Sequence, residues 1–259
     1  MRILAIGDVV GKNGLRFLNS KLKTFKKEQF IDFVIVNGEN SFEFGGITPD
    51  SAKQLFLSGA DIITTGNHTF KRKEIRDFLD MSPNILRPAN YPKKTTPGKG
   101  YLKTEINGIK TCVLNIMGNV YMNGLNCPFE TADEILEAAA DCKVKILDFH
   151  AEATAEKLAM GFYLDGRISA LFGTHTHVQT SDETVLPRGT GYITDIGMTG
   201  PVNSILGVKK ELSIRFMKEK LPVKFENASG NCKIECIIFE IDENTGLTKS
   251  VKRYRITEG

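Results

Sequence analysis

The chain has 259 residues, of which 41% are hydrophobic and 25% charged, so it can bury a sizeable core. Its formal net charge of +3 is too small to indicate a nucleic acid or a membrane surface as partner, so RNA is unsupported by charge. Its five cysteines lack metal-type pairing and no apolar run suits a signal peptide or a membrane span, so we expect a cytoplasmic protein with reduced thiols.

Short apolar runs alternate with amphipathic segments in the first third of the chain. We expect buried strands at 3–6, 33–36 and 61–64, each followed by polar residues. A helix is expected after a loose connection that holds Gly11 and Gly14, and a second helix begins at Thr48 and Pro49. A charged helix over about 71–80 and an ordered, proline-rich loop over 81–100 follow.

The rest of the chain adds hairpins to this alternation. Asn107-Gly108 suits a tight turn between two strands, and Thr131-x-x-Glu134 predicts a helix start. A further helix is expected over about 152–162. The expected strands are 101–106, 109–116, 144–149, 168–172, 192–194, 222–226, 234–241 and 251–256. The pattern predicts an α/β fold in a single domain over 1–259, since no repeat or convincing boundary interrupts it.

Side chains that bind metals follow the predicted strands. All four histidines lie at such positions, two of them in Gly173-Thr174-His175-Thr176-His177. Because ligands collect at the carboxyl ends of strands in these sheets, we expect the side chains to meet. The candidates are Asp8, Glu39, Asn40, Asn67, His68, His150, His175 and His177. Oxygen and nitrogen donors without sulfur suit manganese, iron or zinc, and their number suits two metals that clamp a phosphate.

These residues occur in the order of the calcineurin-like metallophosphoesterase motifs, with two departures. Val10 stands where that superfamily has a histidine, and Glu39 stands where it has an aspartate. With these departures the chain resembles one branch, the YmdB-like phosphoesterases, over essentially its full length. The matching blocks are Ile-Gly-Asp-Val-Val-Gly at 6–11, Asn-Gly-Glu-Asn at 37–40, Gly-Asn-His-Thr at 66–69, Arg-Pro-Ala-Asn at 87–90, Asp-Phe-His-Ala-Glu-Ala-Thr at 148–154, Gly-Thr-His-Thr-His-Val-Gln-Thr at 173–180 and Thr-Asp-Ile-Gly-Met-Thr-Gly at 194–200.

The resemblance implies a four-layer α/β/β/α sandwich with a binuclear metal centre. It assigns Asp8, Glu39, Asn40 and His177 to the first metal, with Asn40 in the place vacated by Val10. It assigns Glu39, Asn67, His150 and His175 to the second, so that Glu39 bridges the pair. The branch is associated with iron or manganese, zinc and magnesium being the alternatives, and with phosphodiesterase activity on 2′,3′- and 3′,5′-cyclic nucleotides.

We therefore expect a hydrolase in which a hydroxide between the metals attacks phosphorus and His68 protonates the leaving alkoxide as general acid. Asp148 and Asp195 can orient ligand histidines, and we expect Thr174 and Thr176 to stabilise their turn. One alternative is a regulatory, nucleotide-sensing protein with a metal site and little turnover. Another alternative is a metal-dependent amidohydrolase. In that class the His-x-His pair belongs to the first strand of a barrel, whereas in this sequence the pair lies late in the chain. The sequence leaves open whether the chain forms a homo-oligomer.

Overall fold

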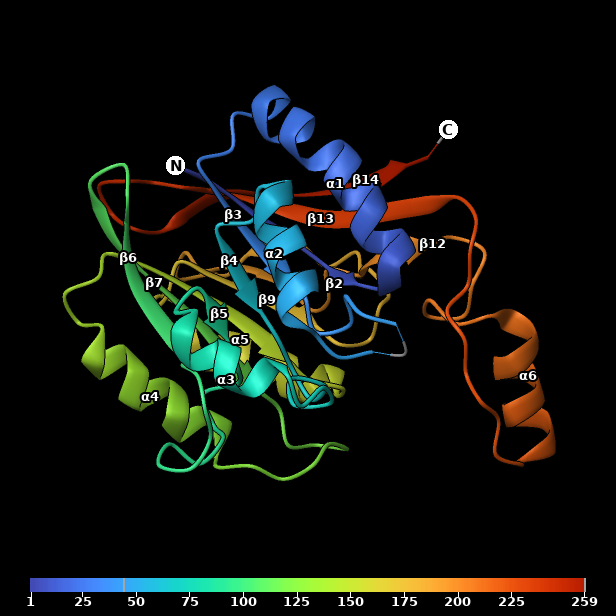
Figure 1. Cartoon of the computed structure of the whole chain (residues 1–259). Coiled ribbons are helices and arrows are strands. Elements are labelled where there is room, and N and C mark those ends of the chain that lie inside the picture. The colour runs from blue at the N-terminus through green and yellow to red at the C-terminus, as the bar shows by residue number, and fades with distance from the viewer. Residues whose placement is uncertain (44, 259) are drawn as a thin grey trace.

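The computed structural model describes residues 1–43 and 45–258, and its strands form two sheets (Figure 1). The first sheet has eight strands, with parallel pairing near its centre and antiparallel pairing towards the C-terminal strands. In order they are β2 (Asp8–Val9), β12 (Met198–Pro201), β13 (Cys232–Ile241), β1 (Arg2–Ile6), β3 (Phe33–Asn37), β4 (Ile62–Thr64) and β5 (Ile85–Leu86), and β14 (Thr248–Thr257) pairs with β13.

The second sheet has six strands, and its four central strands are parallel. In order they are β10 (Thr184–Val185), β11 (Gly191–Ile193), β9 (Ala170–Thr174), β8 (Val144–His150), β7 (Ile109–Met117) and β6 (Tyr101–Ile106). The predicted hairpin is confirmed, because β6 and β7 pair across Asn107 and Gly108, both of which have the positive φ of a tight turn.

Helices cover the outer face of each sheet. The helices α1 (Gly11–Glu28), α2 (Pro49–Ser58) and α3 (Ile75–Met81) share one apolar cluster with the first sheet. The helices α4 (Pro128–Ala138) and α5 (Thr154–Leu164) share another with the second sheet. A third cluster joins the inner faces of the two sheets. The four-layer α/β/β/α sandwich is therefore confirmed.

Alternation along β1 shows how the sequence divides its side chains between these layers. Leu4 and Ile6 pack beneath the helices, whereas Ile3 and Ala5 pack between the sheets. Successive side chains of a strand point to opposite faces, so a strand that is apolar at every position is buried on both sides.

Some helix boundaries differ from the predictions. α1 already begins at Gly11, so the two glycines lie in the helix and not in a loose connection before it. The expected capping box was wrong, because Cys127 is the N-cap of α4 and Pro128 occupies the first helical position. Proline at that position fixes φ for a helix start, and Thr131 lies within the helix, where it is buried.

Other elements were missed or wrongly predicted. The short strand β5 lies within the predicted loop, and β12 and α6 (Lys210–Glu219) were not expected. The expected strand at 222–226 is an irregular segment that returns from α6. In Figure 1, α6 projects from the body of the molecule, and Ser213 is its one buried residue. None of the helices in 1–43 and 45–258 is long and apolar enough to cross a lipid bilayer.

The packing between the sheets yields a prediction about stability. Phe239 is fully buried there, with its ring centroid 6.4 Å from that of Phe172. Phe239→Ala should lower the free energy of unfolding by about 3–5 kcal/mol, because it removes apolar contacts and leaves a cavity. The measurement is urea-induced unfolding. Phe30→Ala is the matched control, since Phe30 is 78% exposed; equal effects of the two changes would contradict the core assignment.

Candidate metal centre

The structure brings the predicted site residues together where the parallel strands of both sheets end. Glu39 and Asn40 follow β3, and Asn67 and His68 follow β4. From the second sheet, His150 ends β8. The remaining members are Asp8 on β2 and the pair His175 and His177, which follow β9.

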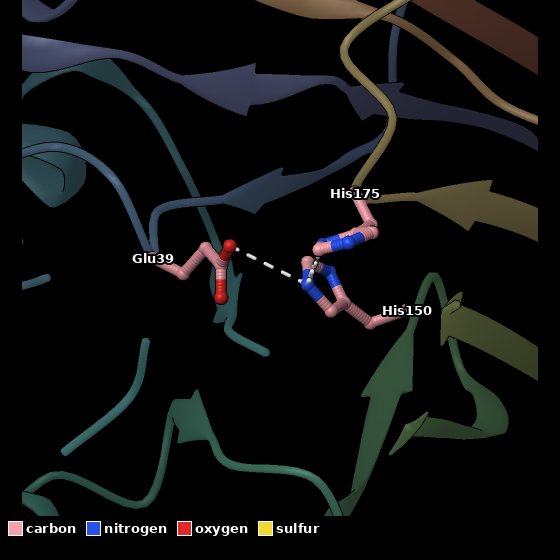
Figure 2. A group of neighbouring side chains, drawn as sticks. All are labelled: Glu39, His150 and His175. Atoms are coloured by element: carbon pink, nitrogen blue, oxygen red, sulfur yellow. Dashed lines mark hydrogen bonds and ion pairs between the residues drawn. The ribbon is translucent and has the colours of Figure 1, made fainter. Parts of the chain in front are cut away.

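The centre of this group is formed by Glu39, His150 and His175, which converge from three different segments (Figure 2). One ligand atom from each of these residues lies within 4.8 Å of the others. Asn67 Oδ1 lies 2.9 Å from His150 Nε2, and His175 Nδ1 lies 3.1 Å from the same nitrogen. These four side chains therefore surround one point.

A second set of donors lies on the other side of Glu39. His177 Nε2 lies 3.5 Å from Asp8 Oδ1 and 3.4 Å from Asn40 Nδ2. Glu39 Oε1 joins the two sets, because it lies 3.0 Å from Asn40 Nδ2 and 3.4 Å from His150 Nε2. The carboxylate of Glu39 is thus placed between two groups of donors.

A hydrogen-bonded chain behind His150 fixes which of its ring nitrogens faces the centre. His150 Nδ1 lies 2.8 Å from Thr174 Oγ1, and that hydroxyl donates to Asp148 Oδ1 at 2.7 Å. When the hydroxyl proton lies on Asp148 and the imidazole proton on Nδ1, Nε2 presents a lone pair to the centre; in the other tautomer, Nε2–H donates to Asn67 Oδ1. Burial raises the pKa of Asp148 to about 7, against hydrogen bonds from Thr64, Thr174 and Asn37.

The other two histidines are oriented in the same way. His177 Nδ1 lies 3.1 Å from the carbonyl oxygen of Leu206, which can only accept, so Nε2 faces Asp8. His175 Nε2 lies 3.0 Å from Glu152 Oε2, which leaves Nδ1 for the centre. Outer partners of this kind set the tautomer and the ring orientation of metal-binding histidines.

The result is a buried convergence of carboxylate oxygens and imidazole nitrogens, in which the Asn40 amide N–H donates to Glu39 Oε1. Asp8 Oδ1 is buried, and among the described residues it makes no hydrogen bond. Burial alone would raise the pKa of Asp8, but its neighbour His177 holds that pKa well below its usual range. Conversely, burial disfavours the charged form of His177, yet Asp8 raises the pKa of this histidine to about 9. Burial lowers the pKa of His150 to about 4, so that ring stays neutral.

The turn that carries the paired histidines is strained and is held by a buried ion pair. His175 and His177 have φ values of 100° and 62°, which non-glycine residues rarely adopt. Asp195 Oδ2 accepts hydrogen bonds from the backbone and the hydroxyl of Thr176, at 3.1 and 2.8 Å. Lys157 Nζ bonds to Asp195 Oδ2 at 2.7 Å and to the Thr174 carbonyl at 2.9 Å. The hydroxyls of Thr174 and Thr176 therefore donate hydrogen bonds to the buried Asp148 and Asp195, respectively.

The close approach of the His150 ring explains why residue 66 is a glycine. A Cβ atom on Gly66 would lie 2.2 Å from the ring of His150. Real Cβ atoms do not come that close, so a side chain here would displace the imidazole.

His68 lies at the rim of the centre and not within it. Its Nδ1 is 2.9 Å from Asn40 Oδ1, and its backbone amide donates to Glu39 Oε2 at 3.1 Å. The side chain is 36% exposed and lines a cavity of about 630 Å³ that opens onto the centre. With Nδ1 bonded to the amide oxygen, Nε2 is the nitrogen that remains for a molecule in the cavity.

Sequence reasoning missed two partners of the histidines. Glu152 lies two residues after His150, within the block Asp-Phe-His-Ala-Glu-Ala-Thr, so its acidic side chain beside a histidine was an available signal. Leu206 acts through its backbone carbonyl, which no residue type encodes, and it comes from a segment for which no structure was predicted.

Comparisons with known proteins agree on one family. A family model described as YmdB-like protein matches residues 4–254. The 2′,3′-cyclic-nucleotide 2′-phosphodiesterase of Bacillus subtilis (strain 168) is 46% identical over 259 residues, which cover 100% of this chain and 98% of that protein. A crystal structure of a hypothetical protein from Thermus thermophilus has a TM-score of 0.94 and 37% identity, with full coverage of both chains. A novel phosphatase from Mycoplasma pneumoniae has a TM-score of 0.94 and 32% identity, with coverage of 99% of this chain and 93% of that one.

The buried pair beneath the histidine turn yields a second prediction. Lys157→Met should lower the free energy of unfolding by about 3–5 kcal/mol, because it leaves the fully buried Asp195 without its counter-ion. Chemical denaturation measures the change. Lys110→Met is the control, since Lys110 pairs with Asp141 at the surface and its loss should have no measurable effect. An unaltered unfolding midpoint in Lys157→Met would show that the turn does not depend on this pair.

Proposed function

This chain belongs to the YmdB-like family, and from that premise we propose that it is a phosphodiesterase that uses two metal ions to hydrolyse cyclic nucleotides. What supports two cations most directly is the convergence of acceptors on both sides of Glu39. The carboxylates of Asp8 and Glu39 are buried there beside three imidazoles, and a proton on His177 Nε2, 3.5 Å from Asp8 Oδ1, is the nearest positive charge to the Asp8 carboxylate. Such a site is stabilised by cations.

The residues present fit two metal ions. Asp8, His177 and the side-chain oxygen of Asn40, which here faces His68 Nδ1, would hold one ion, and Asn67, His150 and His175 would hold the other, with Glu39 shared. Carboxylate, amide and imidazole donors without thiolate suit iron or manganese, and zinc or magnesium are alternatives. Because both sheets supply ligands, we also propose that 1–259 form one domain.

The chemistry requires a nucleophile and a protonated leaving group. When bound, the two cations neutralise charge on a phosphoryl group and supply hydroxide at neutral pH. His68 would act from the cavity side as an imidazolium: Nε2–H gives its proton to the departing ribose oxygen, and the neutral ring keeps the Nδ1 proton on the Asn40 oxygen. The bond from Nδ1 to Asn40 fixes the ring for that transfer. An alkoxide is a poor leaving group, so protonation matters most for a ribose diester.

The proposed substrate is a cyclic nucleotide of the 2′,3′ type, the 3′,5′ type or both. The Bacillus subtilis relative bears the 2′,3′ activity in its name and matches this chain end to end. A metal-loaded sample assayed on both cyclic types, on RNA and on phosphomonoesters tests the proposal. Turnover confined to monoesters would refute it, and binding without turnover would favour the nucleotide-sensing alternative.

Replacing His68 separates its role from metal binding. His68→Ala should slow hydrolysis of a cyclic nucleotide by about 10²–10⁴-fold, because the leaving oxygen then lacks a proton donor. Bis-p-nitrophenyl phosphate should be affected less, since its acidic leaving group needs little protonation. Elemental analysis should find both metals in His68→Ala and neither in Glu39→Ala, which loses the shared carboxylate. Metal loss in His68→Ala, or an unchanged rate on the cyclic nucleotide, would assign His68 another role.

The raised pKa of His177 yields a prediction about pH. In the metal-free protein this imidazole, with a pKa of about 9, carries a proton at neutral pH that a cation must displace. Manganese binding should therefore release a proton, and affinity should rise as the pH increases towards that pKa. Calorimetric titrations in two buffers of different ionisation enthalpy measure the release, and His177→Gln should lack it. Equal heats in the two buffers for the native protein would contradict the protonated state.

A further inference from the structure

The cavity over the centre is also lined by apolar side chains that the proposed chemistry does not use. They are Leu206, Val208 and Phe225, named here the shelf. Phe225 is 39% exposed and Leu206 is 48% exposed, although both are large apolar residues. The cavity of about 630 Å³ lies within the usual range for small-molecule sites, so it has room beyond a phosphate group.

The part of the shelf that holds Leu206 and Val208 is fixed by backbone hydrogen bonds. Ile205 and Val208 exchange backbone hydrogen bonds of 2.9 and 3.0 Å, and Ala228 N donates to the Gly207 carbonyl at 2.8 Å. Leu206 has φ of 53°, a conformation that costs energy and persists where surrounding structure imposes it. Its carbonyl is the one that His177 Nδ1 contacts at 3.1 Å, so the shelf is tied directly to the centre.

Phe225 is supported from behind by α6. The ring of Phe216 meets that of Phe225 edge-on, with centroids 5.4 Å apart and planes 71° apart. Phe216 belongs to α6, the helix that projects from the body in Figure 1. This contact gives the projecting helix a role in holding an aromatic face at the cavity.

Two lysines bring positive charge to the same cavity. Lys71 and Lys224 both line it. The ammonium of Lys71 approaches Gly45, where an added Cβ atom would lie 3.0 Å from Lys71 Nζ and 3.7 Å from His68 Nδ1. An occupant of this cavity therefore meets a cation near His68 and an apolar, aromatic surface on the shelf. That combination suits an anion joined to a flat, apolar ring system.

We infer that the shelf binds the nucleobase of the cyclic nucleotide while the phosphodiester lies over the centre, with Phe225 as the stacking surface. The inference rests on the proposed function and adds to it the part of the enzyme that recognises the base of the substrate. Leucine, valine and phenylalanine side chains have no hydrogen-bonding groups. The shelf therefore contacts the flat face of a base and forms no hydrogen bonds to its edge. It therefore accepts all four bases and favours purines, whose rings offer more surface.

The test compares two substrates that differ only in the base. These are 2′,3′-cyclic AMP and the base-free ribose 2′,3′-cyclic phosphate, each assayed with the metal-loaded full chain. In Phe225→Ala, the ratio of kcat/KM for the nucleotide to kcat/KM for the base-free ester should fall about 5- to 20-fold, the effect of losing a base–aromatic stack. Phe225→Tyr should restore the ratio. Phe30→Ala, another exposed phenylalanine, should leave it unchanged.

Failure of the inference is distinguishable from failure of the proposed function. An unchanged ratio in Phe225→Ala, with both esters hydrolysed, overturns the shelf and leaves the phosphodiesterase standing. If Phe225→Ala alters the sedimentation of the protein, the shelf belongs to a contact between two copies of the chain and the inference is overturned. If the native protein hydrolyses neither ester, the proposed function fails, and calorimetric binding of 2′,3′-cyclic AMP decides: weaker binding in Phe225→Ala supports the shelf, and equal binding overturns it.

Discussion

The orientation of three imidazoles by partners outside the centre is the constraint on which the site depends. Each ring turns one nitrogen to an outward partner: the Thr174–Asp148 chain, the Leu206 carbonyl or the Glu152 carboxylate. The inward nitrogens then meet carboxylate and amide oxygens across Glu39. So many acceptors in a buried space favour a positive charge, and in its absence a proton on His177 serves that purpose.

The two-sheet architecture makes this arrangement possible. One sheet alone brings a row of strand ends to one edge, whereas here the ends of β3 and β4 face those of β8 and β9. The inner apolar cluster, which includes Phe172 and Phe239, packs the two sheets against each other and so positions their strand ends. Rigid packing of this kind matters because metal-binding side chains must be held in place before the ion arrives.

Much of the fold and of the site could be predicted from the sequence, because the signals were local. Buried strands such as 33–36 are short apolar runs, and the side chains that converge in the candidate centre follow them at glycine and asparagine turns. The elements that were not predicted lack such local signals. β12 holds Gly200 and Pro201 and depends on pairing with distant β13, and α6 has no side-chain cap at its start and buries only Ser213. Thr131 matched a capping pattern, but Pro128 already determined the helix start.

The hydrogen bond from His177 Nδ1 to the Leu206 carbonyl has a consequence for cation binding at the proposed centre. The pairing of Val208 with Asn227 closes the base of the segment that carries α6, and the Leu206 contact joins that segment to the site. A molecule that binds the segment more tightly when the segment holds the ring in place would raise the affinity of the centre for a cation. By thermodynamic reciprocity, a bound cation would raise the affinity for that molecule by the same factor.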